Sequence, residues 1–343
     1  MHLENFIRRM PKVELHVHLE GSIQPETLLE LARRNQVTLP ATTVEGLRQW
    51  YTFTDFAHFI EIYITISSCI CSADDIELIA CEFLRGQAAQ NIRHSEVTFT
   101  PYTHFSLNRR IPFADQLAAL SRARDWAAAE LGISVNWVLD ISRNVRPIEH
   151  GLTVADWVIS GRDHGVIALG LGGPENGHPP ELFAEAFDRV LAAGMASVPH
   201  AGEVAGAESV WGALLELKAQ RIGHGVRCLE DAALVAELRK QQIPLEVCPT
   251  SNVCLGVAAS IAEHPLPRLL AAGLYVTINS DDPPMFNTTL TDEYLKITEA
   301  FDFSRETIEH LVLNAVRASL LPELTRTEME KRFQSEFAVL GLG

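Results

Sequence analysis

Eight short apolar runs divide the chain, and longer amphipathic stretches separate them. Two of these stretches, 180–194 and 231–242, carry apolar residues at helical spacing, and the first ends in a glycine, as many helices do. Short strands that alternate with helices pair in parallel, so this order predicts an α/β protein. The strand candidates are residues 13–18, 94–100, 134–141, 166–172, 197–202, 221–225, 244–249 and 275–282.

Eight such units in one unbroken run favour a closed (β/α)8 TIM barrel over an open, doubly wound sheet. The first and second strands are far apart in the chain, so extra helices are expected between them. With 343 residues, 47% of them hydrophobic, the chain can bury one large core, and no stretch has the composition of a linker. We expect a single domain over 1–343, with its chemistry at the carboxyl ends of the strands, where the loops of a barrel converge.

Aromatic residues are concentrated in the long connection at 47–70. They recur at steps of three or four residues, which indicates that most of them pack one helix onto the barrel. A minority of them would form an apolar lid over a small ligand. The residues are Trp50, Phe53, Phe56, Phe59 and Tyr63.

Charge and hydropathy exclude two classes of partner. The formal net charge is −16 and no cluster of lysine and arginine stands out, so nucleic acid is not an expected partner. No apolar run approaches the roughly 18 residues that span a bilayer, and the first residues lack the apolar core of a secretory signal. We expect a cytoplasmic enzyme with a small-molecule substrate; the sequence does not indicate its oligomeric state.

Several catalytic motifs are missing. The six cysteines contain no C-x-x-C pair, which fits free thiols in a reducing compartment. The zinc deaminases that need H-x-E and then P-C-x-x-C are excluded for the same reason. The fourth strand ends in "ALGLGGPE" without the lysine that bridges the metals of binuclear barrel hydrolases, so a single metal is favoured. Its glycines also lack the G-x-G-x-x-G spacing of a dinucleotide site.

Histidines and carboxylates fall at several strand ends. His16 and His18 are two apart on the first strand, so both side chains point to one face, while Val17 points to the other. Alone this pair fits an ordinary hydrogen-bonded site as well as a metal site. Together with His200 after the fifth strand and Asp281 after the eighth, it forms a nitrogen and oxygen set that suits Zn²⁺.

Three more residues near these ends are candidates for chemistry. Glu203 follows His200 by one short turn and could be a general acid held protonated by an apolar pocket, or an acid that complements the next helix dipole. His224, between two glycines, could orient and deprotonate a water, or be structural. Of the adjacent carboxylates, we assign Asp281 to the metal and Asp282 to the substrate, an order that rests on spacing alone.

Taken together, these residues resemble the adenosine deaminase family within the amidohydrolase barrels. The resemblance covers nearly the whole chain and rests on five segments in the family's order: "PKVELHVHLEGS", "VPHAGE", "RIGHGV", "CPTSNV" and "NSDDPPMF". It implies one zinc per chain, with Glu203 protonating the purine N1 and His224 assisting the attacking water. The implied zinc ligands are His16, His18, His200 and Asp281, and the implied substrate contacts are His18, Glu20, Gly173 through its backbone, and Asp282.

The reaction that this resemblance implies is hydrolytic deamination at C6 of a 6-aminopurine. Adenosine or deoxyadenosine is the first expectation, because that is the family's commonest activity. Adenine and aminodeoxyfutalosine, an adenine nucleoside with an enlarged 5′ substituent, are the alternatives. Two departures support them: Glu20 stands where adenosine-specific members carry an aspartate that meets the ribose, and "GLGGPE" replaces "DLAGDE" at 170–175. A purine-binding protein without activity is disfavoured, because no expected ligand or acid is missing.

Overall fold

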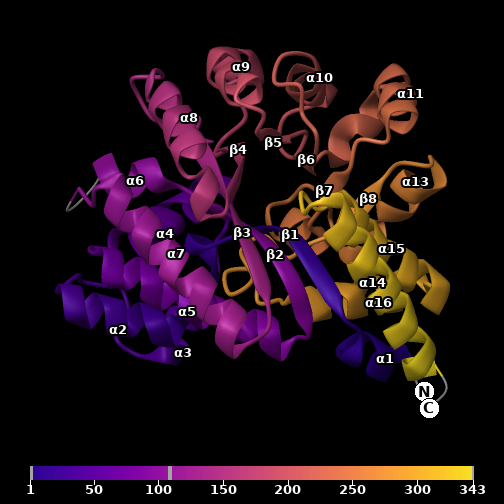
Figure 1. The fold of residues 1–343 in the computed structure, drawn as a ribbon, viewed down its shortest axis with the longest axis horizontal. Coiled ribbons are helices and arrows are strands. Elements are labelled where there is room, and N and C mark those ends of the chain that lie inside the picture. The colour runs from indigo at the N-terminus through magenta and orange to yellow at the C-terminus, as the bar shows by residue number, and fades with distance from the viewer. Residues whose placement is uncertain (1–2, 107–109, 342–343) are drawn as a thin grey trace.

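The computed structural model describes residues 3–106 and 110–341. Within them, eight strands form one sheet in the order β1 to β8, and neighbouring strands pair in parallel. Figure 1 shows the strands in the middle of the molecule with helices around them. The strands are β1 (Lys12–His18), β2 (Ile92–Phe99), β3 (Ser134–Ser142), β4 (Val166–Gly172), β5 (Ala196–Ala201), β6 (Ile222–His224), β7 (Leu245–Val247) and β8 (Val276–Ile278).

The sheet closes into a barrel where the loop after β8 meets β1. Val17 bridges Asp281 in parallel, the His18 N–H donates to the Asp281 carbonyl at 2.9 Å, and the Asp281 N–H donates to the His16 carbonyl at 3.1 Å. The side-chain oxygen of Asn279 accepts hydrogen bonds from the backbone N–H groups of Leu15 and His16. The predicted (β/α)8 barrel is therefore confirmed. Between β8 and β1, hydrogen bonds to the Asn279 side chain replace some of the backbone hydrogen bonds that pair the other strands.

Helices follow the strands and cover the outside of the barrel. Three of them, α2 to α4, precede α5 between β1 and β2, which confirms the extra helices predicted there. The helices are α1 (Leu3–Arg9), α2 (Pro25–Asn35), α3 (Val44–Trp50), α4 (Phe56–Ser68), α5 (Ala73–Ala89), α6 (Pro101–Ser106), α7 (Phe113–Glu130), α8 (His150–Ser160), α9 (Ala184–Ala192), α10 (Ala207–Leu215), α11 (Ala232–Gln241), α12 (Pro249–Cys254), α13 (Leu266–Ala271), α14 (Leu290–Phe301), α15 (Arg305–Ala318) and α16 (Glu323–Gly341).

Side-chain caps fix where several helices begin. The Asp55 carboxylate accepts a hydrogen bond from the His58 N–H at 2.9 Å at the start of α4. Ser72 caps α5 in the same way through the Asp75 N–H. Such caps satisfy N–H groups that have no partner within the helix and stabilise it by about 1 kcal/mol. They set the starts of α4 and α5, and α4 lines the cavity at the mouth of the barrel.

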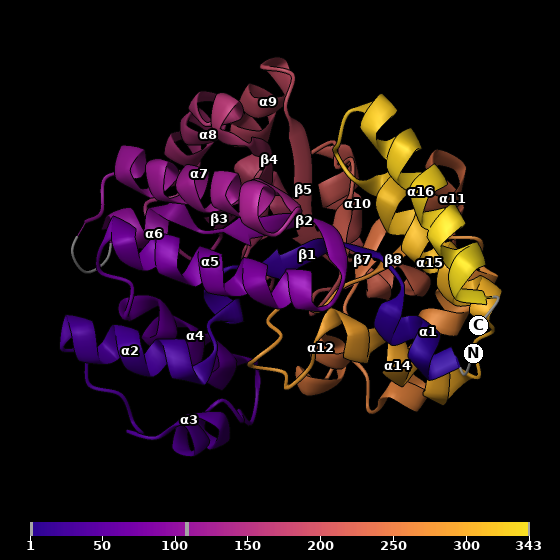
Figure 2. The same ribbon diagram turned by 60° about the horizontal axis from the view of Figure 1, so that its bottom comes forward.

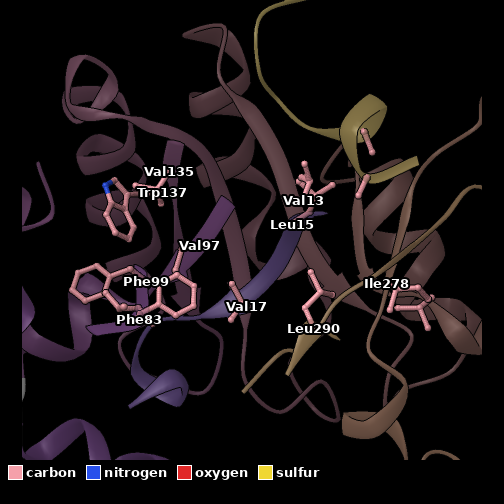
Figure 3. Close-up of a cluster of buried hydrophobic side chains, with 14 of the residues drawn as sticks. Val13, Leu15, Val17, Phe83, Val97, Phe99, Val135, Trp137, Ile278 and Leu290 are labelled. Atoms are coloured by element: carbon pink, nitrogen blue, oxygen red, sulfur yellow. The ribbon is translucent and has the colours of Figure 1, made fainter. Parts of the chain in front are cut away.

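Both faces of the strands are buried, so the core forms two layers. All seven residues of β1 are buried, and its period of two places Val13, Leu15 and Val17 in the apolar layer under the helices. Figure 3 shows these three side chains with others of that layer, such as Phe99 and Trp137. Full burial of a large apolar side chain stabilises the fold by about 1.5–3 kcal/mol. The alternate positions of β1 are left for the polar interior.

The last three strands are shorter than the sequence predicts. In particular β8 ends at Ile278, so Asp281 and Asp282 lie in the loop that follows it. The backbone leaves the strand because the Asn279 side chain bonds to β1 and because Asp281 adopts a left-handed conformation with φ of 66°. The two carboxylates therefore approach the barrel axis from a bend.

The first and last helices of the described residues, α1 and α16, lie beside each other in both Figure 1 and Figure 2. Among the described residues, no single helix has the length and apolar composition to cross a membrane. The helices α4 and α5 reach that length and composition only as a pair, and they are bent by 117° relative to one another.

Candidate active site

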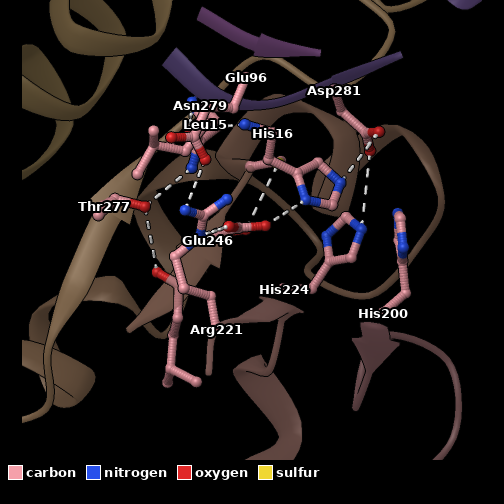
Figure 4. Close-up of polar contacts among 12 residues, drawn as sticks. Leu15, His16, Glu96, His200, Arg221, His224, Glu246, Thr277, Asn279 and Asp281 are labelled. Atoms are coloured by element: carbon pink, nitrogen blue, oxygen red, sulfur yellow. Dashed lines mark hydrogen bonds and ion pairs between the residues drawn. The ribbon is translucent and has the colours of Figure 1, made fainter. Parts of the chain in front are cut away.

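Four histidines and an aspartate converge at the carboxyl end of the barrel. His16 and His18 come from β1, His200 from β5 and His224 from β6, while Asp281 comes from the loop after β8. All five are buried. Figure 4 shows His16, His200 and His224 close to the Asp281 carboxylate. The carboxyl ends of the strands thus bring together side chains that are far apart in the sequence.

Two overlapping sets of four could hold a metal ion. Ligand atoms of His16, His200, His224 and Asp281 all lie within 4.8 Å of one another. The Nε2 atom of His18 also lies 3.1 Å from Nε2 of His200 and 3.4 Å from Oδ1 of Asp281. Oδ1 of Asp281 lies 3.6 Å from Nε2 of His16. Four ligands at about 2.0–2.2 Å from a tetrahedral zinc are about 3.3–3.6 Å apart, a range that includes the 3.4 Å contact between His18 and Asp281 and lies just above the 3.1 Å contact between His18 and His200.

Two polar atoms of this cluster lack a hydrogen-bond partner within the protein. Nε2 of His16 and Nδ1 of His200 are buried without a hydrogen bond, and two imidazole nitrogens face each other between His18 and His200. Unpaired buried polar atoms are costly, whereas a cation among them would use their lone pairs. The donor set, neutral imidazole and carboxylate without cysteine, suits zinc. The residues present therefore fit a bound metal.

Protonation also favours a metal site. Burial, with His16 nearby, holds the pKa of His200 well below its usual range, and burial lowers the pKa of His224 to about 4, so both rings are neutral. Although burial acts in the opposite direction, hydrogen bonding to His16 and the charge of the histidines hold the pKa of Asp281 well below its usual range. His16 differs, because burial lowers its pKa but interactions with the Asp281 and Glu246 carboxylates outweigh burial and raise the pKa to about 10, so a metal would displace a proton from this ring. The neutral His200 and His224 beside an ionised Asp281 are ready to bind a cation.

A buried chain of ionic contacts orients His16 from behind. Nδ1 of His16 lies 2.9 Å from Oε2 of Glu246, whose other oxygen accepts a hydrogen bond from Arg221 Nε at 2.5 Å. A further contact of 2.6 Å joins Arg221 to Glu96. Figure 4 shows this chain of residues behind the histidine ring. The Glu246 carboxylate fixes which nitrogen of His16 carries a proton and leaves Nε2 to face the cluster.

Backbone conformation and the absence of a side chain make room for the cluster. His224 has φ of 62° and Asp281 has φ of 66°, in the left-handed region that non-glycine residues seldom adopt. Such strain collects at functional sites. A Cβ on Gly223 would lie 2.7 Å from Cε1 of His16, so only glycine lets the two strands hold their histidines this close.

Glu203 lies in the turn after β5, and a second carboxylate holds that turn. Glu175 accepts hydrogen bonds from four successive backbone N–H groups, those of residues 202–205, and from the Ser209 hydroxyl. Oε1 of Glu203 is buried without a hydrogen bond and lies 3.6 Å from Nε2 of His224. Burial, and then the charges of Asp281 and Glu175, raise the pKa of Glu203 well above its usual range. Glu203 therefore keeps its proton at pH values at which exposed glutamates are ionised.

The remaining predicted substrate contacts have different surroundings. Asp282 and Gly173 line the cavity beside the histidine cluster. A Cβ on Gly21 would lie 1.6 Å from Oδ1 of Asp282, so this carboxylate packs directly against the turn that follows β1. Burial, and then the neighbouring Asp281, raise the pKa of Asp282 well above its usual range. A protonated Asp282 could donate a hydrogen bond to a ligand nitrogen.

Glu20 is buried and its carboxylate is held by the protein. Oε1 accepts a hydrogen bond from the Thr100 N–H at 2.9 Å and lies 3.0 Å from Nε2 of His104. The Tyr63 hydroxyl approaches Oε2 at 3.5 Å. Glu20 is not among the residues that line the cavity. Thr100 and Tyr63, which hold it, do line the cavity, so Glu20 supports this wall from behind.

The cavity above the histidines has a volume of about 180 Å³ and two unlike walls. Helix α4 provides an apolar wall through Phe56, Phe59, Ile60 and Ile64, together with Tyr63. The opposite wall, at the ends of β2 to β4, carries polar groups. These are Thr100, Thr103, Asp140, Ser142 and Asn144. Three of the five aromatic residues of the long connection, Phe56, Phe59 and Tyr63, thus line the cavity, where the sequence predicted a minority. All five also belong to the core or pack against it, as most of them were expected to do.

Sequence reasoning missed several residues around the site. Asp140, Glu175 and Glu246 are buried carboxylates on or just after strands. An acidic residue within or directly after an apolar strand candidate is a signal that could have found them, because acidic residues are seldom fully buried unless they are paired or functional. Ser251, within the "CPTSNV" segment, donates to Oδ2 of Asp281 at 2.7 Å. Their roles depend on neighbours from other strands, which the sequence does not reveal.

Comparison with known proteins agrees with this arrangement. A family model described as adenosine deaminase matches residues 11–335. An aminodeoxyfutalosine deaminase from Streptomyces avermitilis is 42% identical and covers 93% of this chain and 89% of its own. An adenine deaminase from Trichlorobacter lovleyi is 40% identical and covers 94% of each chain. A solved amidohydrolase from Burkholderia ambifaria with bound zinc has a TM-score of 0.92, 26% identity, and coverage of 99% of this chain and 94% of its own.

The fold and the site define a metal-dependent amidohydrolase built on a (β/α)8 barrel. Within that class, the chain belongs to the adenosine deaminase family. The resemblance predicted from the sequence is confirmed, and the protein is an enzyme that deaminates an aminopurine. The two relatives are named for aminodeoxyfutalosine and adenine, so they support the alternative substrates and give no support to adenosine as the first choice.

Proposed function

We propose that this chain is a zinc-dependent enzyme that removes the 6-amino group of an adenine nucleoside with an enlarged 5′ substituent, of the aminodeoxyfutalosine kind. The observation that carries the proposal is the buried cluster of histidines and Asp281 at the floor of a cavity with one polar and one apolar wall. A purine would lie over the cluster, the polar wall would face the sugar, and the apolar lid of α4 would cover the 5′ substituent.

The proposed ligands of the zinc are His16, His18, His200 and Asp281. The three contacts of 3.1–3.6 Å among their ligand atoms support this choice over a set that includes His224, whose Nε2 lies 3.8 Å from the other oxygen of Asp281. A zinc ion bound there would lower the pKa of a coordinated water toward neutrality and provide the hydrolytic nucleophile.

The proposed catalytic roles fall to Glu203 and His224. Glu203 donates its proton to N1 of the purine, which draws electrons from C6 and makes that carbon easier to attack. His224, neutral and 3.6 Å from Glu203, accepts a proton from the attacking water. Asp282 contacts N7 and the backbone of Gly173 contacts N3, so the ring is fixed at three edges. His224 then passes its proton to the amino group, which leaves as ammonia, and the hydroxyl proton of the intermediate returns to Glu203, so that a 6-oxopurine with N1–H remains.

The cavity lining opposes a phosphate group on the substrate. Among the described residues that line it there is no lysine or arginine, while Asp140, Glu203, Asp281 and Asp282 contribute carboxylates. A phosphate in this space would lose its hydration without gaining a cation. We therefore place nucleotides such as AMP outside the substrate range.

Adenine is the second candidate substrate. The 40% identity with the adenine deaminase of Trichlorobacter lovleyi supports it, as does the small volume of the cavity. Bare adenine would lie on the same cavity floor and make the same contacts through N1, N3 and N7. Without a sugar or 5′ substituent, it would leave the lid facing water.

Formation of the 6-oxopurine product from a panel of substrates tests the proposal. The panel contains aminodeoxyfutalosine, adenine, adenosine and deoxyadenosine, which release ammonia, and N6-methyl-AMP, which releases methylamine, each assayed for kcat/KM with zinc-loaded protein. We expect the highest value for aminodeoxyfutalosine and the lowest for N6-methyl-AMP. A higher value for adenine would move the assignment to the second candidate. Ammonia release from none of them would refute the proposed function.

A further inference from the structure

Asp140 is a buried carboxylate in the cavity to which the proposed chemistry gives no role. It lies near the carboxyl end of β3, is 3% exposed, and lines the cavity together with Thr100 and Gly172. A carboxylate in this position costs free energy unless it is paired or used. Its position at a strand end, where barrel enzymes bind their ligands, indicates use.

Two glycines of β4 make room for Asp140. A Cβ on Gly170 would lie 3.0 Å from Cβ of Asp140, and a Cβ on Gly172 would lie 2.4 Å from its Oδ2 atom. Any larger residue at either position would therefore displace the carboxylate. These glycines belong to the "GLGG" segment, which stands where the resembled family has "DLAGDE". Asp140 of the neighbouring strand therefore packs against this segment.

The carboxylate is oriented by one hydrogen bond. The Thr100 hydroxyl donates to Oδ1 of Asp140 at 2.7 Å, and the Thr100 N–H donates to Glu20 at 2.9 Å. Glu20, which the sequence analysis placed against the sugar, thereby fixes Thr100, and Thr100 fixes Asp140. Oδ2 of Asp140 is left beside Gly172, next to Gly173.

We propose that Asp140 determines specificity by accepting a hydrogen bond from a donor at the sugar edge of the purine. The proposal rests on the proposed function, because Gly173 places N3, and with it N9, on this side of the cavity. The donor is the N9–H of a free base or a ribose hydroxyl of a nucleoside. Both are uncharged donors, and an acidic acceptor favours either of them over a phosphate.

Two pairs of ligands and one isosteric variant separate these sources. Adenine is compared with 9-methyladenine, which lacks the N9–H, and adenosine with 2′,3′-dideoxyadenosine, which lacks two ribose hydroxyls. Each compound is assayed for ammonia release, or as a competitive inhibitor where turnover is absent, with wild-type protein, Asp140→Asn and Asp140→Ala. Asp163→Asn, an exposed aspartate, is the matched control.

Burial raises the pKa of Asp140 to about 7, so the assays are run at about pH 8.5, where this carboxyl is ionised. We expect the wild type to prefer the donor-bearing member of at least one pair by about tenfold or more, as for a hydrogen bond to a charged group. In Asp140→Asn the amide oxygen keeps the Thr100 contact and the NH2 group faces the donor, so the preference should disappear in that pair. The pair that responds identifies the donor. Asp140→Ala should give the same result, and Asp163→Asn should keep the wild-type preference.

An unchanged preference in both pairs, with either variant, would overturn the role of Asp140. So would an equal loss for both members of each pair, because that result indicates a general disturbance of the site. Unfolding of Asp140→Ala would leave the decision to the isosteric Asp140→Asn, checked by its melting temperature. Failure of the wild type to deaminate any 6-aminopurine would refute the proposed function instead, which keeps the two failures distinct.

Discussion

At the residue scale, the site depends on side chains whose second polar atom is held by the protein. Nδ1 of His16 faces Glu246, and Oδ2 of Asp281 accepts from Ser251. The atoms left over, Nε2 of His16 and Oδ1 of Asp281, point toward each other at 3.6 Å. Two of the four proposed ligands, His16 and Asp281, are thus oriented before a metal binds, which lowers the entropic cost of binding it.

Glu203→Gln tests the proposed acid. Glutamine has the same size but cannot protonate N1, so we expect kcat to fall by about 10²–10⁴-fold while zinc content stays at the wild-type level. Steady-state kinetics and metal analysis measure the two effects. Glu216→Gln, an exposed residue of the following helix end, should behave as the wild type. A kcat near the wild-type value for Glu203→Gln would remove Glu203 from the mechanism.

Glu246→Gln tests the support of His16. The substitution removes the charge that holds Nδ1–H of His16 and one partner of Arg221, so we expect zinc affinity to fall by about 10–100-fold. Zinc loss to a competing chelator measures this without an activity assay. The exposed Glu299→Gln is the control. Unchanged zinc affinity in Glu246→Gln would show that His16 does not need this carboxylate.

At the element scale, the sequence predicted the strands well and their ends less well. All eight strand candidates exist, because apolar runs bounded by glycine and polar residues are a local signal. The early end of β8 depends on Asn279, whose partner is in β1 and more than 260 residues away. The proposed roles of His16, His200 and Asp281 came from strand ends and motifs, whereas Asp140 and Glu175 act across neighbouring strands.

The turn after β5 is the element that carries the proposed acid. Glu175 holds this turn through the N–H groups of residues 202–205, so it is a positioning residue for Glu203. A glutamine there can accept fewer of these hydrogen bonds and carries no charge, which lets the turn shift.

Glu175→Gln should therefore lower kcat by on the order of 10²-fold, as expected for a misplacement of about 1 Å, and change KM much less. Kinetics at full zinc loading measure the split between the two constants. Glu208→Gln, an exposed glutamate in the same region, is the control. A rise in KM with unchanged kcat would indicate that Glu175 acts on substrate binding and not on the acid.

At the scale of the whole molecule, the barrel brings distant parts of the chain to one mouth. Strand β1 near the start, β5 and β6 in the middle and the loop after β8 meet at the metal cluster. The helices between β1 and β2 add the lid that faces it. The net charge of −16 and a cavity without lysine or arginine among its described lining residues both disfavour a substrate that carries a phosphate.

The central claim is that one zinc ion, held by this cluster, is required for deamination. The most direct measurement removes the metal with a chelator, verifies its removal by metal analysis, and restores zinc stepwise while ammonia release from the best substrate is followed. We predict no activity without metal and a linear rise that levels off at about one zinc per chain. Full activity in verified metal-free protein, or a plateau at two zinc ions per chain, would contradict the account.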